Sequence, residues 1–415
     1  MGCKVTYIPL GELAKFESGG TPSKKEERYW NGTIPWISAK TLVGDAVCKS
    51  DLCITKQGLD AGSKLAPKGS LLLLTRGSGL FKRIPLAIAE KDVAYNQDIK
   101  CIEATAEGIS NRYLFYALKA LEPAISAMLE TTGIGAGKLA TDRLKALRIP
   151  VLDEAARLKA TYIADCINGK LSLNTKLNGY LAELQQAIYA DNTKEGALTT
   201  IGEIAEVIDC LHSKKPQRQP SGKPLIQLNN IIDDGILDMT DTFYISEDDY
   251  AKWISRCEVK PGDCVITNVG RIGAVSQVPR GTTAAMGRNM TCIRPRAYAA
   301  TVITALCSNA MRHEIEKRTD AGTIMNALNV RNIPKLEFYL PPAKVRDSAE
   351  TTLKTIQDTR ELLLKERQEL AALQDALLPK LMSGEIDVSK IDLTQLNSHL
   401  AKRFMFTMAS LSICQ

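Results

Sequence analysis

An internal repeat constrains this chain more than any other feature of its sequence. The string Leu10–Ala14 returns as Ile201–Ala205, 191 positions later. Three more matches follow in the same order: Pro67–Gly77 with Lys260–Gly270, Leu147–Pro150 with Leu336–Pro341, and Leu181–Ile188 with Leu370–Leu377. Four matches in one order at a nearly constant offset indicate a duplicated unit of about 190 residues, far longer than the repeats of solenoid proteins.

The amino-acid composition of each copy changes once along its length. Its first part is rich in Gly and Pro and contains short β-favouring runs, namely Ile34–Ile37, Ser70–Thr75, Ile99–Glu103, Asp263–Thr267 and Met290–Arg294. A helical stretch is predicted near the end of each part, over Asn111–Leu129 and Ala300–Arg318. The fold class expected for each globule is therefore α+β.

After Pro150 and Pro342 the chain becomes poor in Gly and rich in helix-favouring residues. Apolar residues recur with alternating spacings of four and three: Ile163, Ile167, Leu177, Leu181, Leu184 and Ile188, then Leu353, Ile356, Leu363, Leu370, Leu377 and Leu381. Each helix has about 37 residues and a length of about 55 Å. We expect the two helices to bury these stripes against each other as an antiparallel coiled coil. The alternative, in which each helix packs on its own globule, remains open.

These patterns predict a first globule at 1–150, a first long helix at 151–192, a second globule at 193–341, a second long helix at 342–386 and an unassigned tail at 387–415. Two similar globules at opposite ends of an antiparallel helical pair would be related by a pseudo-twofold axis. That geometry suits a protein that reads two half-sites on one DNA duplex.

The charges are distributed unevenly between the two copies. Residues 1–150 contain 21 Lys and Arg against 15 Asp and Glu, whereas the remaining residues contain 32 of each. A polyanionic partner or an ordinary basic surface would both explain this excess. The 11 cysteines include no C-x-x-C pair, and no apolar run approaches the ~20 residues that span a bilayer. We therefore expect a cytoplasmic protein with free thiols and no membrane partner.

No catalytic constellation assembles in the sequence. His212, His313 and His399 are the three histidines, and none has the spacing of a metal site or lies beside a nucleophile motif. Gly133–Lys138 looks like a phosphate-binding loop, but Leu139 stands where Ser or Thr would coordinate magnesium. No methyltransferase tetrapeptide is present either. The sequence therefore predicts a binding protein that is not an enzyme and that holds no cofactor or metal.

Two segments strongly resemble a known family. The string Leu10–Ser23, followed by Ile34–Ser38, is similar to the opening of target-recognition domains in type I restriction specificity subunits. The segment Leu377–Ile386 is similar to a helical part of the same family. The resemblance covers residues 5–390, including the duplication and both helices.

The resemblance implies a division of labour in a complex. Each globule would read one half of a bipartite, asymmetric target in double-stranded DNA, and the helices would dock two methyltransferase (modification) subunits. Those partners would use S-adenosylmethionine to methylate adenine N6. Restriction subunits would cleave unmodified DNA with ATP and Mg. This chain would be the non-catalytic specificity subunit.

Candidate DNA-binding residues combine hydrogen-bonding groups for base edges with cations for phosphates. In the first globule they are Thr21, Ser23, Lys24, Lys25, Trp36, Ser38, Lys40, Thr75, Arg76, Lys82, Arg83, Asn96 and Gln97. In the second they are Ser213, Lys214, Lys215, Gln227, Asn229, Asn268, Arg271, Arg288 and Asn289. Trp36 is also consistent with a core aromatic residue, and Asn229 and Asn268 with turn residues.

The second globule departs from the family pattern in one loop. Asp209–Ser213 and Lys214–Pro216 replace the Gly-Gly-Thr-Pro string of the first globule. Different loops imply different half-site sequences. Two other functions remain open: a coiled-coil scaffold that does not read DNA sequence, and a degenerate methyltransferase or nuclease.

Overall fold

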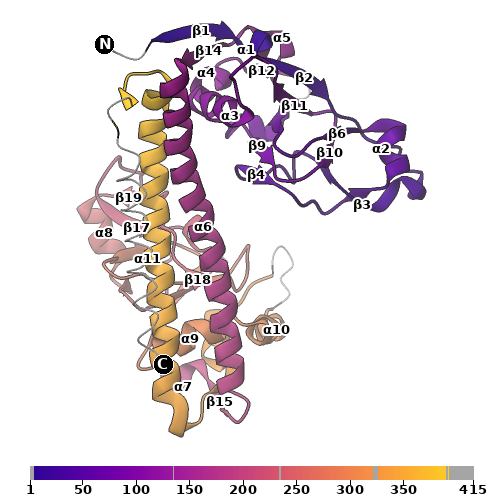
Figure 1. Ribbon diagram of the computed structural model, residues 1–415. Coiled ribbons are helices and arrows are strands. Elements are labelled where there is room, and N and C mark those ends of the chain that lie inside the picture. Colours follow the sequence, from indigo (N-terminus) through magenta and orange to yellow (C-terminus); the bar gives the residue numbers. More distant parts are fainter. Residues whose placement is uncertain (1–3, 134, 233–234, 321–325, 389–390, 392–415) are drawn as a thin grey trace. The chain divides into compact units, whose positions relative to one another are not determined.

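A computed structural model describes residues 4–133, 135–232, 235–320, 326–388 and 391 of the chain (Figure 1). The chain divides into two compact units, the first formed by Met1–Gly169 and Ala371–Gln415 and the second by Lys170–Leu370. Each unit therefore contains one globule and a portion of each long helix. Most of the predicted tail at 387–415 lies outside the described residues.

The first unit contains two main sheets beside a terminal strand pair. The five-stranded sheet has the order β2-β11-β7-β9-β4, formed by Ala14–Ser18, Ile99–Ala104, Leu71–Leu74, Leu86–Ala89 and Ala46–Val47. The four-stranded sheet has the order β5-β3-β10-β6, formed by Cys53–Ile54, Trp30–Ile37, Val93–Tyr95 and Lys64–Ala66. Strands β1 (Val5–Pro9) and β14 (Arg148–Leu152) pair antiparallel. A small sheet joins β12 (Glu130–Thr131), β13 (Gly137–Lys138) and β8 (Arg76–Gly77).

Short helices cover and connect these strands. They are α1 (Leu10–Leu13), α2 (Lys56–Gly62), α3 (Asn111–Ala120), α4 (Glu122–Ser126) and α5 (Thr141–Ala146), with 3-10 turns η1 (Glu27–Tyr29) and η2 (Ser78–Phe81). The predicted helix over Asn111–Leu129 is divided, because Pro123, the second residue of α4, lacks the amide hydrogen that would continue α3. The apolar β7 strand and the buried face of α3 share one core.

The second unit repeats this arrangement. Its five-stranded sheet has the order β16-β24-β21-β22-β18, formed by Ala205–Asp209, Met290–Pro295, Cys264–Thr267, Val275–Gln277 and Gly235–Ile236. Its four-stranded sheet has the order β19-β17-β23-β20, formed by Phe243–Ile245, Lys223–Ile226, Ala284–Met286 and Glu258–Val259. Strands β15 (Ala197–Thr200) and β25 (Glu337–Leu340) pair antiparallel. The other elements are α7 (Ile201–Ile204), η3 (Leu228–Asn230), α8 (Glu247–Trp253), α9 (Ala299–Leu306), α10 (Asn309–Arg318) and η4 (Val330–Lys335).

The two units have the same strand order in their five-stranded and four-stranded sheets. In both, the strand after the first short helix pairs antiparallel with the longest central strand. In both, the four-stranded sheet contains one parallel pair, β3 with β10 and β17 with β23. The predicted duplication and the α+β class are therefore confirmed.

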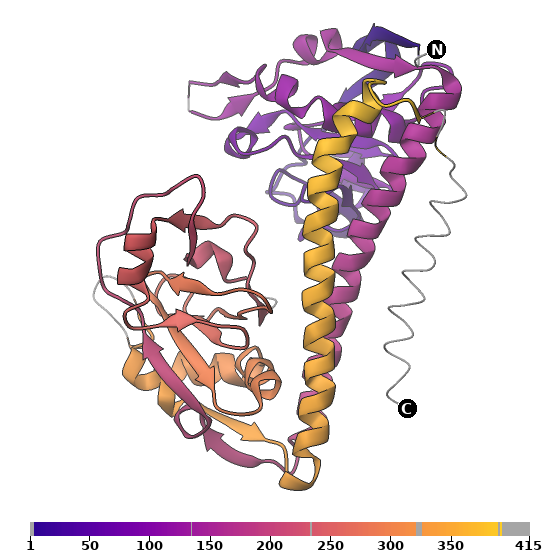
Figure 2. The same ribbon diagram turned by 90° about the vertical axis from the view of Figure 1, so that its left-hand side faces the viewer.

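Two long helices, α6 (Glu154–Asn192) and α11 (Ala343–Met382), correspond to the two predicted helical segments. They lie side by side in both views (Figures 1 and 2). In the second unit Leu181 packs on Ile356 and Leu363. Asn174 forms a hydrogen bond with Glu366, and Asn178 forms one with Arg360. Residue numbers therefore increase along α6 as they decrease along α11. The predicted antiparallel pairing is confirmed there.

One predicted position of the helical stripe is wrong. Leu184 is 48% exposed, whereas the neighbouring Gln185 is buried. The buried positions of α6 in the second unit are Asn174, Asn178, Leu181, Gln185 and Tyr189. The prediction stepped three residues on from Leu181, whereas the buried face steps four, and both spacings keep to one side of a helix with 3.6 residues per turn.

Within the part of the chain that the structure describes, no helix is both long and apolar enough to cross a membrane. The nine described cysteines form no disulfide, and five of them are buried.

Candidate nucleic-acid interface

Main-chain hydrogen bonds bring together four separate segments of the first globule. The amide of Asn96 donates to the carbonyl of Ile37 (3.0 Å), which joins the end of β3 to the loop after β10. The amide of Thr75 donates to the carbonyl of Asp98 (2.7 Å), and that of Leu139 to the carbonyl of Thr75 (2.8 Å). These bonds form a frame, which we name the first frame. Segments that are far apart in sequence therefore present their side chains from one place.

The loop after β2 is fastened to this frame. The amide of Gly20 donates to the carbonyl of Tyr95 (2.9 Å), and the indole N–H of Trp36 donates to the carbonyl of Gly20 (3.0 Å). A Cβ atom on Gly20 would lie 2.2 Å from the carbonyl oxygen of Gly62. Only glycine fits this approach, because no real Cβ atom tolerates such a distance from a backbone oxygen.

Thr21 and Gln97 meet at the edge of the first frame. The Thr21 hydroxyl donates a 2.6 Å hydrogen bond to the side-chain oxygen of Gln97. Gln97 is exposed, so its amide NH₂ is accessible. Ser38 is partly exposed at the end of β3, and Ser23 is exposed in the loop. This arrangement places amide and hydroxyl groups where a base edge could be contacted.

Three predicted residues lie in the interior instead. Trp36 is buried and packs edge-on against Trp30, with ring centroids 5.4 Å apart. The Thr75 hydroxyl donates to the carbonyl of Asp98 (3.0 Å), and the Asn96 amide donates to the Asp98 carboxylate (3.1 Å). Their bonds support the frame, and they present little surface to a ligand.

Most of the predicted cations of the first globule are exposed. Lys24, Lys25, Arg76, Lys82 and Arg83 form no ion pair with any described residue. Lys40 pairs with Asp51 at 3.5 Å, but both side chains are mostly exposed and the pair is weak.

The sequence did not identify Lys138 as a candidate. It lies opposite Arg76 where β13 pairs with β8, in the segment that resembles a phosphate loop. Only the tertiary pairing brings these two cations together.

The second globule contains the same frame, which we name the second frame. The amide of Gly287 donates to the carbonyl of Ile226 (2.9 Å), as Asn96 does to Ile37. The amide of Asn268 donates to the carbonyl of Asn289 (2.9 Å), and that of Leu328 to the carbonyl of Asn268 (2.9 Å). Because the hydrogen bonds are equivalent, residues of the first frame can be matched with residues of the second. The matched pairs are Ser38 with Gln227, Gln97 with Arg288, Asp98 with Asn289, and Thr75 with Asn268.

Five of the predicted residues line one pocket of about 290 Å³ beside the second frame: Lys215, Gln227, Asn229, Arg288 and Asn289. Leu225, Leu228 and Trp253 complete its wall. The Lys215 ammonium lies 4.4 Å from the centroid of the Phe243 ring, a cation–π contact that restrains it. Sequence reasoning missed Leu225, Leu228 and Trp253, and Trp253 reaches the wall from α8.

The remaining predicted residues of the second globule do not line this pocket. Asn268 is buried, where it donates to the carbonyl of Leu328 (2.9 Å) and accepts from the Thr291 hydroxyl (3.0 Å). Arg271 donates to the carbonyl of Ile231 and lines a different pocket. Ser213 and Lys214 lie in the loop after β16, and Lys214 is exposed.

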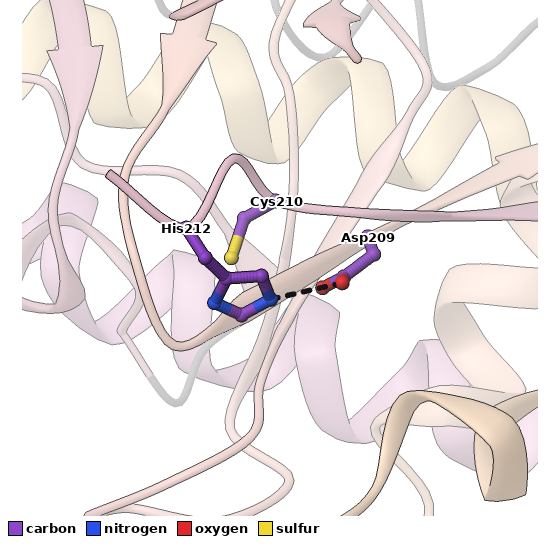
Figure 3. Close-up of side chains that lie close together, drawn as sticks. All are labelled: Asp209, Cys210 and His212. Carbon is purple, nitrogen blue, oxygen red and sulfur yellow. Dashed lines mark hydrogen bonds and ion pairs between the residues drawn. The ribbon is translucent and has the colours of Figure 1, made fainter.

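At the start of that loop, Asp209, Cys210 and His212 lie close together (Figure 3). His212 Nε2 is 2.9 Å from Asp209 Oδ2, and Arg256 donates to the same oxygen at 3.2 Å. Burial raises the pKa of the Cys210 thiol above its ordinary value. The sequence predicted no metal site here, because the histidine spacing matches no common motif.

Comparison with known proteins gives consistent matches. Residues 4–178 match the family described as the type I restriction modification DNA specificity domain. The chain is 33% identical over 150 residues to the EcoR124I/EcoR124II specificity subunit of Escherichia coli, a region that covers 36% of this chain and only 37% of that subunit. It is 23% identical over 424 residues to the MjaIX specificity subunit of Methanocaldococcus jannaschii, covering 92% of this chain and 93% of the relative.

A solved structure shows the same fold over nearly the whole chain. The S subunit of a type I restriction-modification system from M. genitalium matches with a TM-score of 0.59 and 15% sequence identity, over 92% of this chain and 96% of that one. The family match, the relatives and the shared fold agree with the duplicated globules and the paired helices. This chain is therefore similar to type I restriction-modification specificity subunits, through a family match over residues 4–178 and a weaker likeness over nearly its whole length.

Proposed function

We propose that this chain recognises a bipartite, asymmetric target in double-stranded DNA and directs adenine-N6 methylation and restriction by partner subunits. Its relatives are specificity subunits of type I restriction enzymes, which supports a role in target recognition. In this proposal the chain itself is not catalytic. Two modification subunits bring S-adenosylmethionine, and restriction subunits bring ATP and Mg.

The observation that carries the proposal is the difference between matched positions of the two frames. Where the first frame has Ser38 and Gln97, the second has Gln227 and Arg288. Arginine pairs well with guanine O6 and N7, whereas glutamine pairs well with adenine N6 and N7. Identical frames with different side chains suit two half-sites of different sequence.

The surface cations supply the other part of recognition. Lys24, Lys25 and Arg76 in the first globule and Lys214 in the second are exposed. Contacts of this kind neutralise phosphates and release counterions, and they hold a protein on DNA without selecting its sequence.

The long helices present apolar side chains that partner subunits could cover. On α6 in the second unit, Leu173, Tyr180 and Leu184 are exposed at spacings that place them on one side of the helix. Exposed apolar residues that gather on one helical face favour a protein partner.

A methylation map tests the proposal. The chain is co-expressed with its neighbouring methyltransferase gene in a host without adenine methylation, and N6-methyladenine is located by long-read sequencing. We expect a two-part motif with a fixed gap. A single contiguous motif would mean that only one globule reads DNA. A stable complex that methylates no new site would favour the scaffold function.

A further inference from the structure

Three side chains at the end of β16 are of the kinds that bind transition metals. Asp209, Cys210 and His212 each offer one ligand atom, and among the described residues these atoms lie within 4.8 Å of one another. Figure 3 shows the thiol and the carboxylate beside the same imidazole ring. The ligand atoms of a tetrahedral zinc site are about 3.3–3.8 Å apart, given metal–ligand distances of 2.0–2.3 Å. Small side-chain rotations are enough to reach that geometry.

The two oxygens of Asp209 have different surroundings. Oδ2 is bonded to His212 and Arg256, at 2.9 and 3.2 Å. Oδ1 is buried and has no hydrogen-bond partner among the described residues. A buried carboxylate oxygen without a partner lowers the stability of the fold, because it has lost its hydrogen bonds to water and forms none with the protein. A cation bound at Oδ1 would remove this cost and leave the Arg256 bond in place.

The later part of the loop that follows this cluster is held by side-chain contacts, namely the 2.7 Å ion pair of Arg218 with Asp241 and the Lys215 ammonium over the Phe243 ring. Residues 211–218 form no backbone–backbone hydrogen bond with any described part of the chain. In the first globule the matching loop is held by Gly20, whose carbonyl accepts from Trp36. The second globule has Leu225 at the register position of Trp36, so this bond cannot form. The contacts of Lys215 and Arg218 lie in the later part of the loop, so a metal ion held by Asp209, Cys210 and His212 would add a fastening at its start.

We propose that Asp209, Cys210 and His212 bind a zinc-like divalent cation, which fastens the loop after β16 to the end of that strand. Thiolate and imidazole ligands favour zinc over magnesium or calcium, and water would complete a tetrahedral site. The carboxylate and the thiolate supply two negative charges to the ion. Metal binding at this site does not depend on DNA recognition. Its importance for recognition rests on the proposed function, because the loop carries Ser213, Lys214 and Lys215.

Zinc binding by the full chain, purified without a polyhistidine tag, tests the proposal. The chain is equilibrated with zinc chloride, and bound zinc is measured after dialysis. Cobalt chloride is then added to the zinc-free chain, and thiolate-to-cobalt charge-transfer absorption is recorded. We expect one tightly bound ion per chain and a cobalt–thiolate band. His212→Gln should lower zinc affinity at least about tenfold, as expected when a metal site loses a ligand.

Matched variants keep the result interpretable. Cys210→Ser should abolish the cobalt–thiolate band, and His212→Gln provides an independent variant because His212 is exposed and its loss spares the core. Cys48→Ser and His313→Gln change a cysteine and an exposed histidine elsewhere and should leave binding unchanged. Zinc should also slow amide hydrogen exchange in residues 211–218.

Absence of stoichiometric zinc, or equal affinity in the wild-type chain and both site variants, would overturn the metal site. Bound zinc without slower exchange in the loop would overturn the fastening role. Neither result depends on DNA, so both are distinguishable from a failed methylation map.

Discussion

The guanidinium of Arg360 on α11 donates a 2.9 Å hydrogen bond to the side-chain oxygen of Asn178 on α6. A second bond, also 2.9 Å, reaches the side-chain oxygen of Gln185. Gln185 in turn donates to the Thr304 hydroxyl on α9 at 2.9 Å. This buried network joins both helices to the globule of the second unit. Apolar contacts tolerate sliding, whereas such bonds are satisfied in one register only.

Arg360→Ala should destabilise the helical pair of the second unit by about 3 kcal/mol, because the buried side-chain oxygens of Asn178 and Gln185 would lose their hydrogen bonds to the guanidinium. Native-state hydrogen exchange of amides in residues 170–192 and 343–370 measures this local free energy. Lys365→Ala is the control, since Lys365 is exposed and its ion pair with Glu369 is long, at 4.0 Å, and therefore weak. Equal exchange in the two variants would show that the network adds no stability.

Gln97→Ala should relax one position in one half-site and leave the gap and the other half-site unchanged. Arg288→Ala, at the matched position of the second frame, should affect the other half-site alone. A lost bidentate base contact costs about 1–3 kcal/mol of discrimination. Methylation maps of both variants provide the comparison. Relaxation of the same half-site by both would contradict the assignment of one half-site to each frame.

Arg76→Ala should weaken binding of specific and random duplexes to similar extents. Arg76 is exposed beside Lys138 and forms no ion pair with a described residue, as expected of a phosphate contact. Loss of one phosphate contact should reduce the slope of log affinity against log salt by about 1. Titrations over a range of salt concentrations measure it. Lys194→Ala, which removes an exposed pair with Asp191, should leave the slope unchanged.

Gly20→Ala should destabilise the first unit by about 2 kcal/mol or more, since its new Cβ would collide with a backbone oxygen that cannot move aside. Gly79→Ala is matched to it, because a Cβ there meets no atom within 4 Å. Thermal denaturation of both variants measures the difference. Similar melting temperatures would mean that the loop after β2 is free to shift.

Glu361→Gln should stabilise the chain at neutral pH but not in acid. Burial raises the pKa of the Glu361 carboxyl above its ordinary value of 4.5. A raised pKa in the folded state favours folding fully below about pH 4.5 and less as pH rises through the folded value. The neutral amide avoids the buried charge. Urea titrations at several pH values should show the two stabilities converging in acid, and a constant difference would refute this explanation.

The fold could be predicted to the level of the repeat because matching strings such as Leu10–Ala14 and Ile201–Ala205 preserve both composition and order. The exact buried positions on the two long helices could not be predicted. The pattern predicted that Leu184 is buried. Gln185 is buried instead, because its side-chain amide forms hydrogen bonds with Thr304 and Arg360. A polar side chain enters an interior only when tertiary partners satisfy it, and local sequence does not specify those partners.

The candidate interface shows the same limit. Gln97 and Arg288 were identified by residue type, and both lie beside a frame. The pairing of Arg76 with Lys138 was not foreseen, since 62 positions separate them and a strand pairing brings them together. The Asp209 cluster was also missed. Neighbouring residues of an extended strand usually point to opposite faces, but β16 ends at Asp209, so Cys210 and His212 do not follow that alternation.

Both frames are held by amide and carbonyl groups that every residue type possesses, apart from the missing amide hydrogen of proline. The side chains at Ser38, Gln97, Gln227 and Arg288 can therefore change without removing any of the main-chain bonds that form the two frames. The ability to fold and the choice of DNA target can therefore change independently of each other. A lineage could acquire a new target by a few substitutions in one globule while the other kept its old one.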